Sequence, residues 1–104
     1  MDSLAVIPGL TPEQTQKILS LLMSVSPERV ILFGSRAMGT FRPGSDIDLA
    51  LDGGHLNQDD RMKLLVQYPR LNLPFRLDLV ILAQLKEPVL RTHIENEGRL
   101  LKPE

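Results

Sequence analysis

Hydrophobic residues near the start of the chain recur every three to four positions, which is the spacing of one face of an α-helix. The positions in this stripe are Ile18, Leu19, Leu22 and Val25. Upstream of the stripe, Thr11 is suited to be the N-cap, Pro12 to occupy the first helical position, and Gln14 to complete a capping box. The pattern therefore predicts a helix from Pro12 to about Met23.

Later hydrophobic segments are short and lack helical spacing, which indicates β-strands. Residues 29–33 predict a strand buried on both faces, because the residues after Arg29 are apolar without alternation. Residues 46–51 form a second strand that is closed by the turn signal at Gly53. Residues 76–82 predict a third strand, and residues 99–102 predict a short strand at the edge of the sheet.

Further helices are predicted between and after these strands. One follows Asn57, a suitable N-cap. Its first turn contains Asp59 and Asp60, whose negative charges interact favourably with the helix dipole. The last spans residues 88–96 and ends near Gly98, a residue suited to the left-handed position after a helix. Alternating helices and strands predict an α/β or α+β fold, with helices packed on one face of a small mixed sheet.

Composition limits the classes of protein to which the chain can belong. Its 104 residues suit one domain, residues 1–104, and 12 basic against 13 acidic side chains give a formal charge of −1. This balance argues against direct binding of nucleic acid. The chain has no cysteine for disulfides or thiolate metal sites. No signal peptide and no apolar run near the roughly 20 residues of a membrane span are found, so we expect a cytoplasmic protein.

The chemistry concentrates between the first and second predicted strands. The first strand stops at Gly34 and Ser35, and after ten residues Asp46 and Asp48 follow at positions i and i+2. In a strand, such carboxylates share one face about 6–7 Å apart, where they repel each other unless a cation lies between them. Mg²⁺ prefers such oxygen ligands and often binds together with phosphate. Gly34 permits a sharp turn and close approach of a ligand, and Ser35 adds a hydroxyl beside backbone amides, so we predict a triphosphate site here.

This arrangement resembles the signature of the DNA polymerase β-like nucleotidyltransferases. Residues 34–39 and 45–49 are most similar to the minimal nucleotidyltransferase (MNT) group. The resemblance implies a fold like the polymerase β palm and two Mg²⁺ ions with ATP as substrate. It also implies that Asp46 and Asp48 ligate the metals, that Asp78 binds the catalytic metal, and that Gly34 and Ser35 hold the triphosphate.

Three of the candidate residues have open alternatives. Asp78 is a single carboxylate in an apolar strand, which is costly to bury unless it is paired or binds a metal. It would otherwise face solvent or form an ion pair with Arg76. Arg36 and Arg42 either clamp phosphate oxygens or are solvated loop residues, and we favour Arg36 as a nucleotide-binding residue.

Other polar residues have simpler interpretations. Asp52 is interpreted as a turn residue and Ser45 as the start of a strand. His55 and His93 have no partner at metal-ligand spacing and are expected to be structural or exposed. Tyr68 is at helical spacing with neighbouring leucines, which favours a core or rim position over a role as nucleotide acceptor.

The resemblance also implies a partner. Minimal nucleotidyltransferases lack an acceptor-binding domain and are commonly paired with a separate helical protein, in many cases a HEPN-family ribonuclease in a toxin–antitoxin module. The first hypothesis is therefore an antitoxin of a type VII-like system. It transfers AMP from ATP to a tyrosine hydroxyl of a HEPN toxin, and the two proteins form a hetero-oligomer. One alternative is an antitoxin that acts by binding alone. Another is a catalytic subunit that works with a substrate-binding protein on a small molecule, such as an aminoglycoside or a nucleotide.

Overall fold

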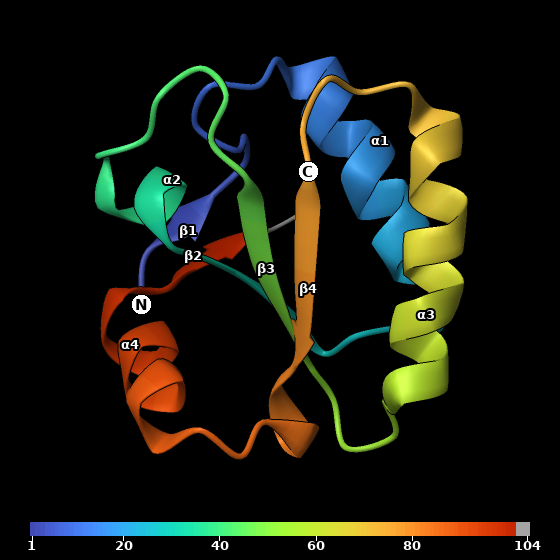
Figure 1. The fold of residues 1–104 in the computed structure, drawn as a ribbon, viewed down its shortest axis with the longest axis vertical. Coiled ribbons are helices and arrows are strands. Elements are labelled where there is room, and N and C mark those ends of the chain that lie inside the picture. Colours follow the sequence, from blue (N-terminus) through green and yellow to red (C-terminus); the bar gives the residue numbers. More distant parts are fainter. Residues whose placement is uncertain (102–104) are drawn as a thin grey trace.

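The computed structural model, described for residues 1–101, contains one five-stranded mixed sheet (Figure 1). Its strands are β1 (Ser3–Leu4), β2 (Arg29–Phe33), β3 (Ile47–Asp52), β4 (Leu77–Ile81) and β5 (Arg99–Leu101). They lie in the order β1-β5-β2-β3-β4. β2 is antiparallel to both of its neighbours, whereas β3 and β4 are parallel to each other, as are β1 and β5. The mixed sheet predicted from the sequence is confirmed.

Helices lie on both faces of this sheet. They are α1 (Pro12–Leu22), α2 (Ser35–Met38), α3 (Gln58–Gln67) and α4 (Pro88–Glu97). Single 3₁₀ turns, η1 to η3, span Met23–Val25, Tyr68–Leu71 and Leu82–Gln84. α1 and α3 lie together on one side of the sheet and α4 lies on the other (Figure 1). The expectation that helices cover a single face was therefore incomplete. No helix in the part of the chain that the structure describes has the length and hydrophobicity needed to cross a bilayer.

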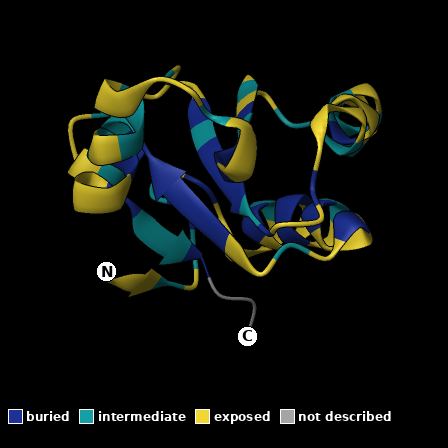
Figure 2. Ribbon diagram, turned by 90° about the horizontal axis from the view of Figure 1, so that it is seen from below, coloured by how far each residue is buried: buried dark blue, intermediate teal, exposed yellow. Residues whose placement is uncertain are grey.

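The alternation of side chains along β2 and β3 divides the core into two layers. The larger layer, toward α1 and α3, includes Leu32 and Leu49, neither of which is exposed to solvent. The smaller layer contains Ile31, Ala50 and Ile94 of α4. Buried residues run along the strands and the inner faces of the helices, as Figure 2 shows. The smaller layer is the one that matters for function, because Asp48 alternates onto the same face of β3 as Ala50.

Both predicted helix starts are confirmed. The Thr11 hydroxyl oxygen accepts a hydrogen bond from the Gln14 amide at 3.1 Å, and the Gln14 side chain accepts one from the Thr11 amide at 2.9 Å. Asn57 and Asp60 form the same reciprocal pair before α3, at 3.0 Å in each direction. These caps satisfy amides that have no partner within the helix, so short segments of sequence determine where each helix begins.

The ends of the chain differ from the expectation. β1 was not predicted, and it pairs with β5 from the outer side. β5 therefore lies inside the sheet, between β1 and β2, rather than at its edge. The predicted end of this strand at Lys102 lies outside the described residues. β1 has only two residues, too few to show a recognisable sequence pattern, so it is identified only by its pairing with β5.

Gly98 follows α4 as predicted, but for a different physical reason. Its backbone is extended, at φ −68° and ψ 151°, so it is not a left-handed cap. A Cβ at this position would overlap the Ile94 carbonyl oxygen and the Ile31 side chain. The glycine is thus required because the helix end packs tightly against β2.

A buried hydrogen bond anchors the segment that precedes α1. The Thr15 hydroxyl, fully buried, accepts from the Ile7 amide at 3.1 Å. Thr15→Val keeps the shape of the side chain but leaves this buried amide without a partner. We expect a loss of about 1–3 kcal/mol in the free energy of unfolding, measured by urea denaturation. Thr92→Val, on the exposed side of α4, is the matched control and should change stability little; equal effects of the two substitutions would contradict this account.

Candidate active site

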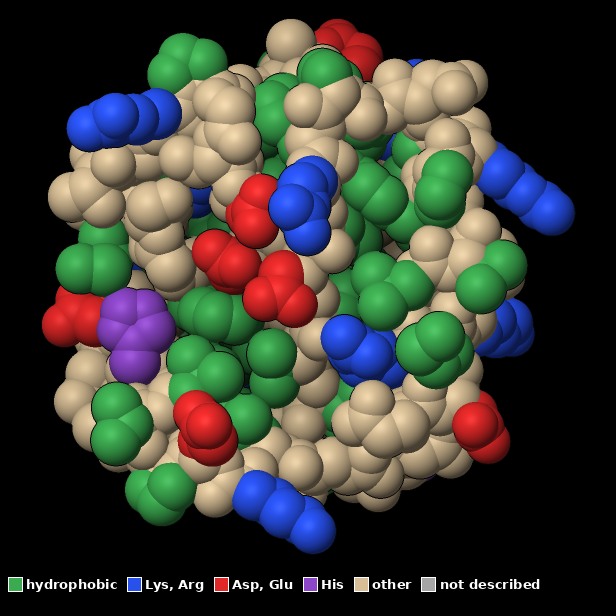
Figure 3. Space-filling view, viewed as in Figure 1, with side chains coloured by type: hydrophobic (Ala, Val, Ile, Leu, Met, Phe, Trp, Pro, Cys, Tyr) green, Lys and Arg blue, Asp and Glu red, His purple; other side chains and the backbone are tan. Residues whose placement is uncertain are grey.

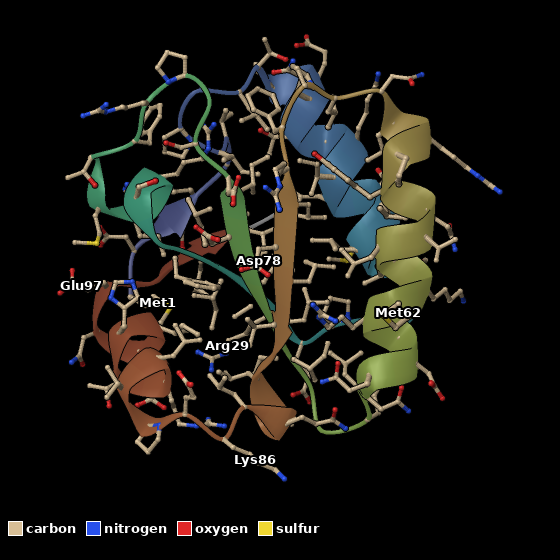
Figure 4. The ribbon with its side chains drawn as sticks, viewed as in Figure 1. Met1, Arg29, Met62, Asp78, Lys86 and Glu97 are labelled. Carbon is tan, nitrogen blue, oxygen red and sulfur yellow. The ribbon has the colours of Figure 1, made fainter. Side chains whose placement is uncertain are left out.

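Carboxylates from two neighbouring strands meet on one face of the sheet. Asp48 of β3 and Asp78 of β4 are direct partners in the parallel ladder. Side chains at paired positions project to the same face, and the strands are about 4.8 Å apart. Asp78 projects from β4 toward β3 (Figure 4). Asp46 lies just before β3, which begins at Ile47 rather than at Asp46 as predicted, and is exposed. Acidic side chains gather at this place on the surface (Figure 3).

The charges of these carboxylates act on one another. Burial raises the pKa of Asp48 above its usual value, and the negative charges of Asp78 and Asp46 raise it further, whereas Arg36 and His93 oppose the shift. Among residues 1–101 the ion pairs are Arg29–Asp52 and Arg99–Asp2, so the alternative pair between Arg76 and Asp78 is not formed. A partly buried carboxylate with like charges on either side is unfavourable to folding but well suited to bind a cation.

The raised pKa of Asp48 leads to a pH-dependent prediction. Because folded Asp48 holds its proton more tightly than unfolded Asp48, this residue makes the protein less stable as pH rises from the unfolded-state pKa through the folded-state pKa. In EDTA, Asp48→Asn should therefore unfold at a higher temperature than wild type at pH 7. The difference should shrink as pH falls below the pKa of Asp48. Scanning calorimetry at several pH values tests this, and a lower unfolding temperature for the variant at pH 7 would contradict it.

The bend after β2 lies directly against Asp48. Phe33, the last residue of β2, is the ladder partner of Asp48. Gly34 follows with φ 74° and ψ −157°, a conformation that side chains with a Cβ rarely adopt. A Cβ on Gly34 would overlap the Oδ2 atom of Asp48. Ser35 then begins α2. The glycine-serine bend and the carboxylate are thus close enough for one ligand to contact both.

The donor set fits a divalent cation in its chemistry and charge. Mg²⁺ prefers carboxylate and phosphate oxygens, and the three acidic residues supply the former on one face. Within residues 1–101, however, no three acidic or histidine side chains are already arranged closely enough to enclose a metal ion. A nucleotide's phosphate oxygens would add to the carboxylate ligands that Asp46, Asp48 and Asp78 can supply to a magnesium ion.

Arg36 occupies a different environment from the one expected of a phosphate ligand. Only 1% of its surface is exposed. Its guanidinium donates to backbone carbonyls: Nη1 to Pro8 at 2.7 Å, Nη2 to Ser45 at 2.7 Å and Nε to Asp46 at 3.3 Å. Arg42, in the loop between α2 and β3, is exposed. The hydrogen bonds of Arg36 are therefore directed into the protein.

The other polar candidates have structural roles, but two differ from the expectation: Asp52 ends a strand instead of forming a turn, and Ser45 lies in the turn before β3 instead of starting the strand. Asp52, the last residue of β3, forms an ion pair with Arg29 at 2.7 Å. The Ser45 hydroxyl accepts from the Arg42 amide at 2.8 Å and stabilises the turn before β3. A ring nitrogen of His55 lies 3.0 Å from the Val25 carbonyl oxygen.

Tyr68 uses its hydroxyl inside the protein. The hydroxyl donates to the Phe75 carbonyl at 2.7 Å, and burial raises its pKa. Modification of this oxygen would break the bond, which agrees with a core or rim role for Tyr68.

His93 lies beside the site, which the sequence did not indicate. Its ring meets Phe33 edge-on, with centroids 6.3 Å apart at 80°, and its charge is near enough to act on Asp48. No local signal could have placed His93 there, because its position depends on how α4 packs against β2.

A mixed sheet with a glycine-serine bend against carboxylates from two adjacent strands agrees with the nucleotidyltransferase motif found in the sequence. The sequence profile of the family "Polymerase beta, Nucleotidyltransferase" matches residues 16–104. The chain therefore belongs to the polymerase β-type nucleotidyltransferases, as its sequence motif indicated.

Solved structures narrow the resemblance to the MNT group. A toxin–antitoxin structure with AMP-PNP shares 30% identity over 86% of this chain and 73% of its own, with a TM-score of 0.67. The toxin–antitoxin MntA-HepT shares 26% identity over 90% of this chain and 74% of its own, with a TM-score of 0.63. A minimal nucleotidyltransferase shares 32% identity over 80% and 84%, with a TM-score of 0.61. A search of curated proteins found no match.

Proposed function

We propose that this protein, a single domain acting in the cytoplasm, is an Mg²⁺-dependent adenylyltransferase. In this proposal it transfers AMP from ATP to a tyrosine hydroxyl of a HEPN-type toxin and thereby acts as the antitoxin. The observation that supports the chemistry best is the pairing of Asp48 with Asp78 directly beside the Gly34 bend. This arrangement supports a site in which acidic metal donors and a phosphate-binding backbone lie within reach of one nucleotide.

Each residue of the site has its own role in the proposed reaction. Gly34 and Ser35 hold the triphosphate at the bend, and Asp46, Asp48 and Asp78 would hold two Mg²⁺ ions. Such a pair of ions would stabilise the charge on the attacking and leaving oxygens. The acceptor oxygen gives up its proton to solvent and forms a bond to the α-phosphorus, while the bond from that phosphorus to the pyrophosphate oxygen breaks and pyrophosphate leaves.

The acceptor is expected to approach from the β4 side. β4 is the outermost strand of the sheet at this end, and Asp78 is exposed on it. Asp48, on the interior strand, is partly buried beneath the bend. The nucleotide would thus lie over Asp48 and Gly34, and the hydroxyl of a separate protein would reach Asp78 from solvent.

Two comparisons support the choice of nucleotide and partner. AMP-PNP, present with one toxin–antitoxin relative, is an ATP analogue, which favours ATP for this chain. MntA-HepT is a toxin–antitoxin pair, which favours a toxin as the partner and a hetero-oligomer as the assembly.

The direct test is a mass measurement on the partner. The chain is purified with the protein encoded beside it and incubated with ATP and Mg²⁺, and the partner is weighed intact with and without nucleotide. We expect a gain of one or more AMP units, located on tyrosine by peptide mapping. An unchanged partner mass, with wild-type protein shown to be folded, would reject transfer to this partner.

One alternative is an antitoxin that neutralises its toxin by binding alone. Under that alternative Asp46→Ala and Asp48→Ala still neutralise the toxin in cells, whereas under the proposal they do not. A catalytic subunit that acts on a small molecule is the remaining outcome. It predicts no HEPN motif in the neighbouring protein and label from [α-³²P]ATP on the small molecule.

A further inference from the structure

Arg36 has the largest of the fully buried side chains among residues 1–101. A buried guanidinium is costly unless its donors are satisfied. Three of its nitrogens donate to backbone carbonyls, as described above, and these carbonyls come from two separate segments: Pro8 before α1, and Ser45 with Asp46 before β3. One side chain of α2 therefore joins the metal-binding end of β3 to the N-terminal segment.

Two aromatic rings complete the surroundings of this guanidinium. Its central carbon lies 5.0 Å from the centroid of the Phe41 ring and 5.1 Å from that of Phe75. Both distances are within the range of cation–π attraction. Phe75 is three residues before Asp78. The same cation therefore contacts the segment that leads to the third carboxylate.

Gly9 shows that space has been left for the guanidinium. Its φ of 89° is a conformation that favours glycine. A Cβ at Gly9 would overlap Nη1 of Arg36 and the ring of Phe41. The N-terminal segment thus passes against the guanidinium at a distance that only a glycine allows.

We propose that Arg36 is a positioning residue that holds Asp46 and Asp78 in place for metal binding, rather than a ligand of the nucleotide phosphates. This inference rests on the proposed metal-dependent function and assigns a role at the same site. Asp46 precedes β3 and lacks the ladder bonds that fix Asp48, so its position depends on the carbonyls that Arg36 binds. Lysine cannot replace this contact, because it lacks the planar fork of donors.

Metal binding is the readout that separates the two roles. Mn²⁺ binding to the full chain without nucleotide is followed by electron paramagnetic resonance of the free ion. AMP-PNP binding in EDTA is followed by calorimetry. For Arg36→Lys we expect Mn²⁺ affinity to fall about 10- to 100-fold, as is typical when a residue that supports metal ligands is changed. We expect AMP-PNP affinity in EDTA to stay within about twofold of wild type.

Arg91→Lys is the matched control. Arg91 also donates to backbone carbonyls, those of Leu82 and Leu85, but it lies on α4 and both carbonyls come after the end of β4. Its substitution should leave Mn²⁺ affinity unchanged. Should Arg36→Lys fail to fold, Phe75→Leu keeps the arginine and removes one aromatic face, and a several-fold loss of Mn²⁺ affinity is then expected.

Several outcomes would overturn the assignment. A loss of AMP-PNP affinity in EDTA with normal Mn²⁺ affinity would make Arg36 a phosphate ligand. Equal losses of Mn²⁺ affinity in Arg36→Lys and Arg91→Lys would mean that Arg36 only stabilises the fold. If Arg36→Lys does not fold, wild-type Mn²⁺ affinity in a folded Phe75→Leu would mean the same. Wild-type protein that binds no Mn²⁺ would overturn the assignment as well. Because neither measurement needs an acceptor, failure to modify a partner protein would be recognised separately.

Discussion

Asp48→Asn is expected to lower the rate of nucleotidyl transfer by about a thousandfold, equivalent to about 4 kcal/mol of transition-state stabilisation. Asp48 comes two residues after Asp46 in the chain and is the ladder partner of Asp78 on β4. It also lies against the Gly34 bend. It is therefore the carboxylate best placed to contact both metal ions of the proposed site. The amide keeps the shape of the side chain but removes the charge that would hold the cations. The measurement is the initial rate of AMP transfer to the partner, with saturating ATP and Mg²⁺.

Asp52→Asn is the matched control for this prediction. Asp52 is on the same strand and, four residues further along, on the same face, but it forms an ion pair with Arg29 at the other end of β3. Exposed ion pairs contribute about 0–1 kcal/mol, so a small loss of stability and a normal rate are expected. Equal rates for wild type and Asp48→Asn, with both proteins folded, would remove Asp48 from the reaction.

Gly34→Ala is expected to abolish transfer and also to destabilise the fold by about 3 kcal/mol. The new methyl group would overlap Oδ2 of Asp48, and the backbone at φ 74° and ψ −157° would be strained by any Cβ. Either the carboxylate or the bend must move, and each shift would separate the proposed phosphate site from the proposed metal ligands. Thermal unfolding and the rate of AMP transfer are measured on the same preparation.

Gly39→Ala distinguishes this collision from simple backbone strain. Gly39 also has a positive φ, 77°, but a Cβ there would meet no atom within 4 Å. Its substitution should cost about 1 kcal/mol of stability, from the left-handed conformation alone, and should preserve the rate. If both variants lost activity equally, the contact between Gly34 and Asp48 would not be the cause.

Much of the local structure could be predicted because its causes lie within a few residues of sequence. The caps at Thr11 and Asn57 satisfy amides three positions downstream, which fixes the starts of α1 and α3. The strand at residues 29–33 is confirmed with the bounds expected, since an apolar run ended by Gly34 leaves little freedom. Gly98 was also recognised, although crowding against Ile31 and not a left-handed turn accounts for it.

Arg36 shows where such reasoning stops. An arginine beside a glycine-serine bend is a sensible candidate for binding phosphate. The nearest carbonyl acceptor of its guanidinium in the sequence is nine residues away and the farthest is 28 residues away. Whether such an arginine faces solvent or the interior depends on how distant segments fold around it, and no local pattern reports that.

The sequence by itself determined the motif, the helix starts, the strands that carry the carboxylates and the family to which the chain belongs, because each depends on near neighbours or on fixed spacing. Only the tertiary structure decided that β5 lies inside the sheet, that Asp48 and Asp78 are ladder partners, and that Arg36 is buried beneath the site. These features arise from pairing and packing between segments far apart in the chain, where strand order and register are set by the fold as a whole.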